Sequence, residues 1–399
     1  MSKTLLLDLD NTLLGNEMDA FIPAYLQALA RCMSPYADPR LLAKTLMTAT
    51  SLMVQNQLPN LTLMEVFDAA FYPALHLNKA DVQTTIDGFY AQDFPRLRNL
   101  TTQKPEAVRL VKQALESGYQ VGVATNPLFP LAAIQQRLAW AGLPANQNNF
   151  SLIPSYSSFH FAKPNPAYFA EFLAQMGWPE GPIVMVGDEA DMDIIGARQL
   201  GIAAFWIPAL PDASWSGPGA EPPRGRLEDV LTWLESAPSE SLKPDFNSPQ
   251  ALLAILCSTP AALKTLCGSY ITPNWTQRPK AGEWSLTEVV CHLRDVETEV
   301  FAPRFIKVIN EENPFLIGID SDSWAVQRNY IQQDGLKALL AFVSKRIELL
   351  SLLSALPSES WFRPARHAFF GPTNLQELAS FVADHDRLHI QQIHRLLKH

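Results

Sequence analysis

The first half of the chain alternates short apolar runs with amphipathic stretches. Five apolar runs have the length of buried strands, and helical spacing of apolar residues separates the later ones. Strands that alternate with helices at this interval predict an α/β domain with a parallel, doubly wound, Rossmann-like sheet. The expected strands are residues 4–7, 120–124, 150–154, 183–186 and 203–206, and the helices between the later strands are residues 128–140, 166–176 and 191–200.

The stretch from about residue 15 to residue 100 interrupts this alternation. It is rich in helical patterns, such as residues 21–32 and 41–53, and it has few candidate strands. We therefore expect a helical insertion that forms a cap over the strand ends. A helix over residues 227–235 should close the domain, and we place the boundary near residue 240, in a segment rich in helix-breaking residues.

The second half of the chain changes to long helices without convincing strands. Four main helices joined by proline-rich loops favour an all-α four-helix bundle. Their expected starts are an N-cap with a first-turn proline at Ser248-Pro249, a capping box from Ser285 to Glu288, a run over residues 336–356, and a cap at Thr373 or Asn374. The expected organisation is an α/β domain over residues 1–236, a linker over 237–248 and the bundle over 249–399.

Composition and charge narrow the class of protein. A net charge of −9 argues against non-specific nucleic-acid binding, which needs a basic face. The apolar run at the N-terminus is short and interrupted by Asp8 and Asp10, unlike a secretory signal. No stretch reads as the roughly 20 predominantly apolar residues of a membrane span, so we expect no membrane helix. Four cysteines without C-x-x-C spacing indicate reduced thiols in a cytoplasmic protein.

Carboxylates follow two of the expected strands directly. Asp8 and Asp10 come after the first strand, and Asp188 comes after the strand at 183–186. Unpaired carboxylates at the edge of a core are costly, so they are not placed there for stability. Ligands of doubly wound sheets bind beyond the carboxyl ends of the strands. Two acidic strand ends that face each other would form an oxygen-rich site suited to Mg²⁺.

The residues around these carboxylates have the chemistry of phosphoryl transfer. Asp8 is a candidate nucleophile toward phosphorus, and Asp10 is a candidate acid and base for the leaving oxygen and for water. Thr125 and Asn126 follow the strand at 120–124 and precede a helix expected to start at Pro127, which suits phosphate binding. In addition, Lys163 could neutralise the nucleophile and the phosphoryl group, and Asp193 could hold Lys163 or a metal-bound water.

Each of these residues also has an ordinary explanation when taken alone. Asp8 or Asp188 could cap a helix, Thr125 could belong to a turn, and Lys163 could be a solvated surface lysine. Together, however, the elements follow the expected strands in the order that a phosphoryl-transfer site requires. The combination therefore favours a catalytic site.

This order resembles the haloacid dehalogenase-like hydrolase superfamily over about residues 1–236. The resemblance rests on Asp8-x-Asp10-x-Thr12, Thr125, Lys163-Pro and Gly187-Asp188-x4-Asp193. It implies that Asp8 is phosphorylated, that Asp10 is the acid and base, and that Mg²⁺ is held by Asp8, Asp188 and the backbone carbonyl of Asp10. The carboxylate of Asp10 favours phosphoryl transfer over dehalogenation, because dehalogenases of the family lack it. A small phosphorylated metabolite is the expected substrate.

A second set of candidate ligands lies in the helical half. His385 and His389 are four residues apart, and they share a helix face with the apolar positions Leu378 and Val382. His292 follows the capping box on another apolar helix face. A single inward histidine is usually a hydrogen-bonded core residue, but three that converge in a bundle predict a divalent-metal site.

This half resembles the DinB-like superfamily of four-helix metal-binding proteins over about residues 245–399. The matching features are Gly282-Glu-Trp-Ser285, His292-Leu-x-Asp295 and His385-Asp-x-x-His389-x-x-Gln392. The resemblance implies that the three histidines hold Zn²⁺ or Ni²⁺, and some members use a low-molecular-weight thiol as S-transferases or hydrolases. Two alternatives stay open: the bundle carries the principal activity, or it is a sensor or a homodimerisation module.

Overall fold

The computed structural model describes residues 3–210, 212–268, 273–280 and 282–397. The chain divides into two compact units. The first is formed by Met1–Gln57, Leu61–Phe172 and Pro179–Pro244, and the second by Leu58–Asn60, Leu173–Trp178 and Asp245–His399. Each unit is described separately below.

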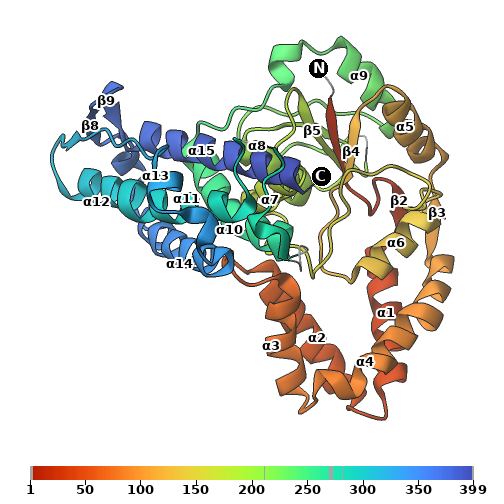
Figure 1. Cartoon of the computed structure of the whole chain (residues 1–399). Helices are drawn as coiled ribbons and strands as arrows, with labels where there is room; N and C mark the ends of the chain where they lie inside the picture. The colour runs from red at the N-terminus through yellow and green to blue at the C-terminus, as the bar shows by residue number, and fades with distance from the viewer. Residues whose placement is uncertain (1–2, 211, 269–272, 281, 398–399) are drawn as a thin grey trace. The chain divides into compact units, whose positions relative to one another are not determined.

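A parallel sheet forms the centre of the first unit (Figure 1). Its strand order is β4-β1-β5-β6, so the chain moves to one side of β1 and then returns to the other side. The topological switch point, where ligands bind in doubly wound sheets, therefore lies between β1 and β5. The strands are β1 (Thr4–Leu7), β4 (Gln120–Val123), β5 (Ile183–Gly187) and β6 (Ala203–Trp206).

Helices pack on both faces of this sheet, because alternate strand residues point to opposite sides. Leu5 and Leu7 belong to a buried cluster with α5 (Pro105–Glu116) and α9 (Val230–Ser236). On the other face, Gly122 allows the close approach of α7 (Pro166–Gln175): a Cβ atom at residue 122 would lie 2.6 Å from the Phe172 ring. Further short elements are α6 (Leu131–Trp140), η3 (Ala190–Ile195), α8 (Gly196–Leu200), η4 (Leu227–Asp229) and η5 (Ser239–Leu242).

The predicted fold class is confirmed, with two local corrections in this unit. Residues 150–154 are not a strand: only Leu152 forms a bridge, to Gly122. The helix expected from Pro127 begins at Leu131 instead. Pro130 adopts an extended conformation, and a proline also disfavours helical geometry in the residue before it. Thr125 and Asn126 consequently do not lie at a helix N-terminus.

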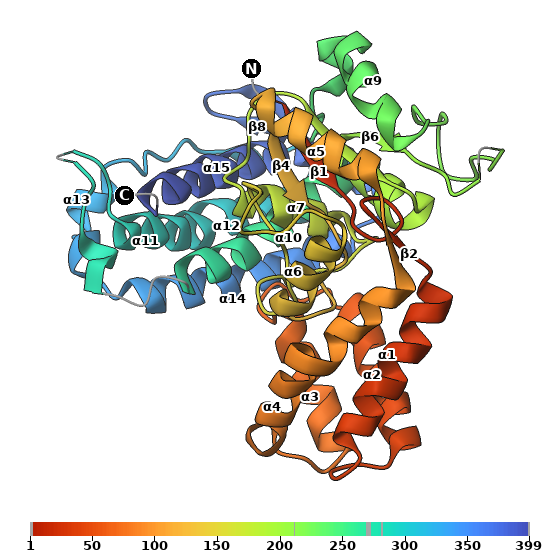
Figure 2. The ribbon, with the colours of Figure 1, turned by 90° about the vertical axis from the view of Figure 1, so that its right-hand side faces the viewer.

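The helical insertion begins and ends at a pair of short antiparallel strands. These are β2 (Leu14–Asn16) and β3 (Thr101–Gln103). Between them, the helices gather on one side of the sheet domain (Figure 2). Aromatic residues dominate their shared core, where Phe94 packs against both Phe21 and Trp140. The elements of the cap are α1 (Met18–Met33), α2 (Pro39–Val54), α3 (Leu63–Ala74), α4 (Lys79–Gly88), η1 (Phe89–Asp93) and η2 (Phe94–Leu100).

The second unit is a four-helix bundle. Its first helix, α10 (Pro249–Gly268), packs against α14 (Gly335–Ser354) and α15 (Leu375–Leu396), and α11 (Leu286–Val296) also contacts both. The capping box at Ser285 and Glu288 is formed, and Asn374 rather than Thr373 caps α15. The chain continues from α11 through the π-helical turn η7 (Glu297–Phe301) into α12 (Ala302–Asn310); the short turns are η6 (Pro273–Thr276), α13 (Trp324–Gln327), η8 (Tyr330–Gln332) and η9 (Ser358–Phe362).

The expectation that this half lacks strands is wrong. A small three-stranded sheet is formed by β7 (Phe315–Leu316), β8 (Pro364–His367) and β9 (Gly371–Asn374). Residues of β8 alternate between exposed and buried, as in a half-buried strand, and Gly371 takes up the positive φ of the turn before β9. Strands of two to four residues are too short to produce a recognisable period in the sequence.

The expectation about membrane helices also needs correction. The apolar helix α10 is long enough and apolar enough to cross a membrane, with a mean hydropathy of 1.5 over 18 residues. In the structure, 67% of that stretch is buried inside the protein. The bundle core therefore accounts for the apolar composition of this helix.

A fully buried arginine, Arg346 on α14, contacts α10, α15 and the turn η7 that continues α11. The Arg346 guanidinium on α14 donates to both carboxylate oxygens of Glu297 at 2.7 and 2.9 Å. It also donates to the Asp386 carboxylate on α15 and, at 3.1 Å, to the Leu256 carbonyl on α10. Because the guanidinium has no solvent exposure, its charge is balanced by these two carboxylates alone among its described partners.

Loss of this cation should destabilise the bundle strongly. We expect Arg346→Ala to lower the free energy of unfolding by about 3–5 kcal/mol, because two buried carboxylates lose their partner. Hydrogen exchange of the α14 and α15 amides measures this locally, without interference from the first unit. The neighbouring variant Lys345→Ala is the control: it removes an exposed ion pair with Glu348 and should cost less than about 1 kcal/mol. Equal effects of the two substitutions would contradict the role of Arg346.

Candidate functional sites

The acidic residues of the first unit meet where β1 and β5 end. Leu7 pairs with Val186 in the register of the two strands, and the Asp8 amide donates to the Val186 carbonyl at 3.0 Å. Asp8 and Asp188 therefore leave adjacent strands at the same edge of the sheet. The Thr12 hydroxyl donates to the Asp188 carboxylate at 3.3 Å. The structure thus brings the two acidic strand ends together at the switch point.

A buried lysine links this edge to a third segment of the chain. The Lys163 ammonium lies 2.7 Å from Asp8 Oδ1 and 2.5 Å from Asp193 Oδ1. The Lys163 side chain is only 1% exposed, so both ion pairs are shielded from water. Burial opposes the charge on Lys163, but the Asp193 and Asp8 carboxylates raise the pKa of its ammonium overall. The lysine is therefore held charged beside Asp8.

Asp193 reaches Lys163 because Gly187 leaves space for it. A Cβ atom at position 187 would lie 2.2 Å from Asp193 Oδ2. The same carboxylate accepts a hydrogen bond from the Glu189 amide at 3.1 Å, within the π-helical turn η3 that follows β5. The spacing of Gly187, Asp188 and Asp193 is thus a packing requirement as well as a chemical one.

Asp10 is held by two side chains that the sequence analysis did not link to it. The Asn16 amide donates to Asp10 Oδ1 at 2.8 Å, and the Arg137 guanidinium on α6 forms an ion pair with Asp10 Oδ2. Arg137 is 1% exposed and lies over the rings of Phe21 and Phe129. A charged residue on the apolar stripe of α6 was the signal that could have identified it.

Thr125 and Asn126 lie at the end of β4, next to the same edge. The carbonyl of Thr125 accepts a hydrogen bond from the Tyr168 hydroxyl at 2.8 Å, and Thr125 itself is 2% exposed. Asn126 Oδ1 accepts the Lys163 amide at 3.1 Å. Asn126 therefore positions the segment that carries Lys163.

The electrostatics of this cluster fit a divalent cation. Burial and the carboxylates of Asp193, Asp10 and Asp188 raise the pKa of Asp8 well above its usual value, although Lys163 opposes this. Burial and the neighbouring Asp193 and Glu189 raise the pKa of Asp188 to about 7. Donor oxygens of Asp8, Asp188 and Asp193 lie within 4.8 Å of one another. Crowded carboxylates with raised pKa values are the surroundings that Mg²⁺ stabilises.

The three candidate histidines of the second unit also converge. His292 on α11 and His385 on α15 have their Nε2 atoms 3.1 Å apart. The ring centroid of His389 lies 4.9 Å from that of His292 and 4.5 Å from that of His385. His389 Nδ1 lies 2.9 Å from Gln392 Oε1, so an Nδ1–H donor there leaves Nε2 free to bind a metal.

The surroundings keep these imidazoles neutral. Burial and the neighbouring His389 lower the pKa of His292 to about 3, and burial lowers the pKa of both His385 and His389. The Trp284 ring lies 5.0 Å from His292, and the Phe301 ring lies 5.1 Å from His385. Neutral imidazoles with lone pairs directed at one point are suitable ligands for a transition metal.

The spacing of the possible ligand atoms of His292 and His385 supports the same fit. Their Nε2 atoms are separated by 3.1 Å, near the roughly 3.4 Å expected between two nitrogens on one tetrahedral Zn²⁺ with bonds of about 2.1 Å. The donor set therefore fits Zn²⁺ or Ni²⁺ better than Mg²⁺, which prefers oxygen.

Family models match both units. A model of the haloacid dehalogenase-like hydrolases matches residues 2–201, and a model of the DinB superfamily matches residues 258–393. The two matches cover separate parts of the chain, and they agree with the two resemblances seen in the sequence.

Two curated proteins resemble part of this chain. The phosphoserine phosphatase of Thermus thermophilus is 31% identical over 129 residues, which are 31% of this chain and 50% of that protein. The pyrimidine 5'-nucleotidase YjjG of Escherichia coli is 34% identical over 115 residues, which are 28% of this chain and 48% of that protein. The chain thus spans about half the length of each of these relatives.

Among solved structures, YfiT from Bacillus subtilis is similar to part of this chain. It is described as a probable metal-dependent hydrolase with an unusual four-helix bundle topology. The similarity covers 41% of this chain and 89% of YfiT, with 21% sequence identity and a TM-score of 0.34.

The acidic cluster should bind Mg²⁺ through Asp188. We expect Asp188→Asn to weaken Mg²⁺ binding at least tenfold, because the site loses one of its charged oxygen ligands. Isothermal titration calorimetry of the whole chain measures this. Asp191→Asn is the matched control, since Asp191 is exposed in the same turn and should leave the affinity unchanged. An unchanged Kd in Asp188→Asn would exclude Asp188 as a ligand.

The histidine cluster should hold about one equivalent of Zn²⁺ or Ni²⁺. After metal loading and desalting, we expect His385→Ala to retain little of this metal by elemental analysis, because two imidazoles hold a divalent ion much more weakly than three. His394→Ala removes a histidine from the same helix but outside the cluster, and it should retain the metal. The site would be refuted by equal metal content in wild-type protein and His385→Ala.

Proposed function

Because the chain belongs, through residues 2–201, to the haloacid dehalogenase-like hydrolases, we propose that its first unit hydrolyses phosphomonoesters with the help of Mg²⁺. The observation that carries this proposal is the pairing of the Asp8 carboxylate with one buried ammonium, that of Lys163. Asp8 lies 2.7 Å from Lys163, and a second carboxylate, Asp10, follows two residues later. A nucleophile paired with a separate acid and base fits two-step phosphoryl transfer.

In the first step, an oxygen of Asp8 attacks phosphorus while the bond to the substrate alcohol breaks. The leaving oxygen takes a proton from the Asp10 carboxyl group. In the second step, water attacks the phosphorus of the aspartyl phosphate and gives its proton to Asp10. Inorganic phosphate leaves, Asp8 is regenerated, and Asp10 is protonated as it was at the start.

The remaining residues stabilise charge in these steps. Lys163 stands beside the attacking oxygen, and we infer that the Thr125 hydroxyl and Asn126 bind phosphoryl oxygens. Asn16 and Arg137 fix the orientation of Asp10. Asp8, Asp188 and the backbone carbonyl of Asp10 would hold Mg²⁺, with Asp193 supporting it through Lys163 or a bound water. When bound, the cation would neutralise charge on the phosphoryl group.

Small phosphorylated metabolites are the substrate class we infer. The two curated relatives are named as phosphatases of a phosphorylated amino acid and of a nucleotide, and both are phosphomonoesters. The net charge of −9 and the absence of C-x-x-C spacing support a cytoplasmic protein that binds neither nucleic acid nor membrane.

For the second unit, we propose a metal-dependent reaction at His292, His385 and His389. The observation in its favour is the pair of facing Nε2 atoms of His292 and His385, close to the aromatic rings of Trp284 and Phe301. A bound Zn²⁺ or Ni²⁺ would activate a thiol or a water molecule, as in an S-transferase or a hydrolase. A metal-stabilised sensor or homodimerisation module is the alternative, and turnover of candidate thiol substrates by the metal-loaded protein separates the two.

Substitution of the nucleophile should abolish phosphatase activity. We expect Asp8→Asn to lower kcat for small phosphomonoesters by about 10³-fold or more, because the acyl phosphate cannot form. Release of inorganic phosphate from a panel of phosphometabolites measures this, with and without Mg²⁺. Asp191→Asn should keep wild-type rates. Full activity of Asp8→Asn would refute the proposed mechanism.

A further inference from the structure

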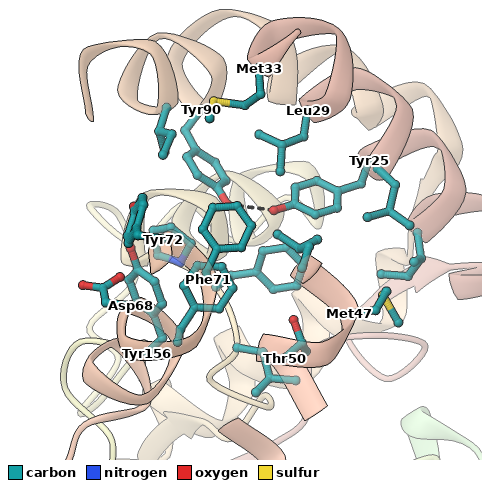
Figure 3. A pocket seen from close by; sticks show the side chains of 18 of the residues that line it. Tyr25, Leu29, Met33, Met47, Thr50, Asp68, Phe71, Tyr72, Tyr90 and Tyr156 are labelled. Atoms are coloured by element: carbon teal, nitrogen blue, oxygen red, sulfur yellow. Dashed lines mark hydrogen bonds between the residues drawn. The ribbon is translucent and has the colours of Figure 1, made fainter. Parts of the chain in front are cut away.

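A cavity of about 200 Å³ lies inside the cap of the first unit. It is lined by residues of α1, α2, α3, α4 and η1, by residues 128–130 that follow β4, and by Tyr156 (Figure 3). None of the residues that line it belongs to the proposed reaction or to the acidic cluster. The cavity is therefore a separate feature that the proposed chemistry does not explain.

The walls of the cavity are aromatic and apolar. Six of its aromatic side chains are Tyr25, Phe71, Tyr72, Tyr90, Phe129 and Tyr156. The hydroxyls of Tyr25 and Tyr90 lie 3.0 Å apart and hydrogen-bond to each other, as Figure 3 shows. Burial raises the pKa of Tyr25 to about 12, which keeps its hydroxyl neutral. The walls therefore offer ring faces and few free polar groups.

The one acidic side chain in the lining is already paired. Asp68 accepts a hydrogen bond from the Lys79 ammonium at 2.6 Å, and both side chains are partly exposed at the edge of the cap. This pairing leaves no net charge for a ligand to balance. A charged group placed among the apolar walls would lose its hydration without gaining a partner.

Two short chains of contacts connect the cavity to Asp10. Met18 lines the cavity, and its sulfur accepts from the Asn16 amide at 3.5 Å; that amide also donates to Asp10. Phe129 lines the cavity as well, and its ring lies 5.4 Å from the guanidinium carbon of Arg137, which pairs with Asp10. Asn16 and Arg137, which hold the proposed acid and base Asp10, thus also contact residues of the cavity wall.

We propose that this cavity binds the alcohol portion of the substrate, and that this portion is an uncharged apolar or aromatic ring. The inference rests on the proposed phosphatase activity and specifies its substrate class. An apolar cavity of about 150 Å³ is sufficient for benzene, so this cavity admits a six-membered ring with small substituents. Aromatic walls add edge-to-face and stacking contacts to such a ring. A zwitterionic alcohol such as serine finds no partner for its charges here.

Three phosphate esters of aliphatic alcohols test the proposal. Benzyl phosphate carries a neutral ring, O-phosphoserine a zwitterion, and phosphocholine an organic cation. We expect wild-type protein to have a kcat/KM for benzyl phosphate at least tenfold higher than for the other two, since a buried ring contact is commonly worth a factor of ten or more. A preference for phosphoserine or for phosphocholine would overturn the proposed class.

A matched pair of variants on α2 locates the effect in the cavity. Met47 lines the cavity and is 50% exposed, whereas Leu52 is 43% exposed on the same helix and does not line it. Both sites should tolerate a larger side chain. We expect Met47→Trp to fill the entrance and to lower the preference for benzyl phosphate about tenfold, while Leu52→Trp keeps the wild-type ratio. Equal ratios in the two variants would overturn the proposal.

A binding measurement separates failure of this inference from failure of the phosphatase proposal. Binding of 4-fluorobenzyl alcohol, followed by ¹⁹F NMR, requires no turnover. We expect saturable line broadening with wild-type protein and with Leu52→Trp, and none with Met47→Trp. If no phosphomonoester is hydrolysed, the phosphatase proposal fails while this binding still decides the ligand class of the cavity. Absence of binding to wild-type protein would overturn the inference, even if hydrolysis is observed.

Discussion

The acidic cluster at the ends of β1 and β5 depends on the ion pairs of Lys163 with Asp8 and Asp193. They join the end of β1, the turn before α7 and the segment after β5, which lie far apart in the sequence. A buried ammonium or carboxylate alone would cost several kcal/mol, so each of these groups requires the others in place. Gly187 without a side chain and Asn126, which holds the Lys163 amide, both serve this arrangement.

The need to pair buried charges also shapes the bundle, but there it leaves a different set of ligands. Arg346 forms ion pairs with both Glu297 and Asp386, so these carboxylates are already occupied although Asp386 directly follows His385. Among the described residues, the group of possible metal ligands there consists of the imidazoles of His292, His385 and His389. In the first unit, by contrast, carboxylates crowd around Asp8 and Asp188, whose pKa values are raised. Each unit thus presents ligands suited to a different class of metal.

Most of the architecture could be predicted because it depends on local patterns. β1 and β6 match the predicted ranges to the residue, and the capping box at Ser285 marks the start of α11. The predictions that failed concern features that depend on contacts between distant segments. Residues 150–154 are apolar but pair through Leu152 alone, and β7 has only two residues. Arg137 was missed because its role is created by Asp10, more than a hundred residues away.

The same distinction between local patterns and contacts of distant segments explains why the acidic cluster could be predicted and the cap cavity could not. Reacting groups are polar residues at strand ends, where an apolar context makes them conspicuous in a sequence. The residues that line the cap cavity are aromatic and aliphatic, so their composition is that of ordinary core residues. They come from the helices α1 to α4, the π-helical turn η1 and two loops. Only the folded chain shows that they surround a space rather than fill it. The sequence therefore reveals the polar groups of the acidic cluster, whereas the cavity of the cap becomes visible only in the folded chain.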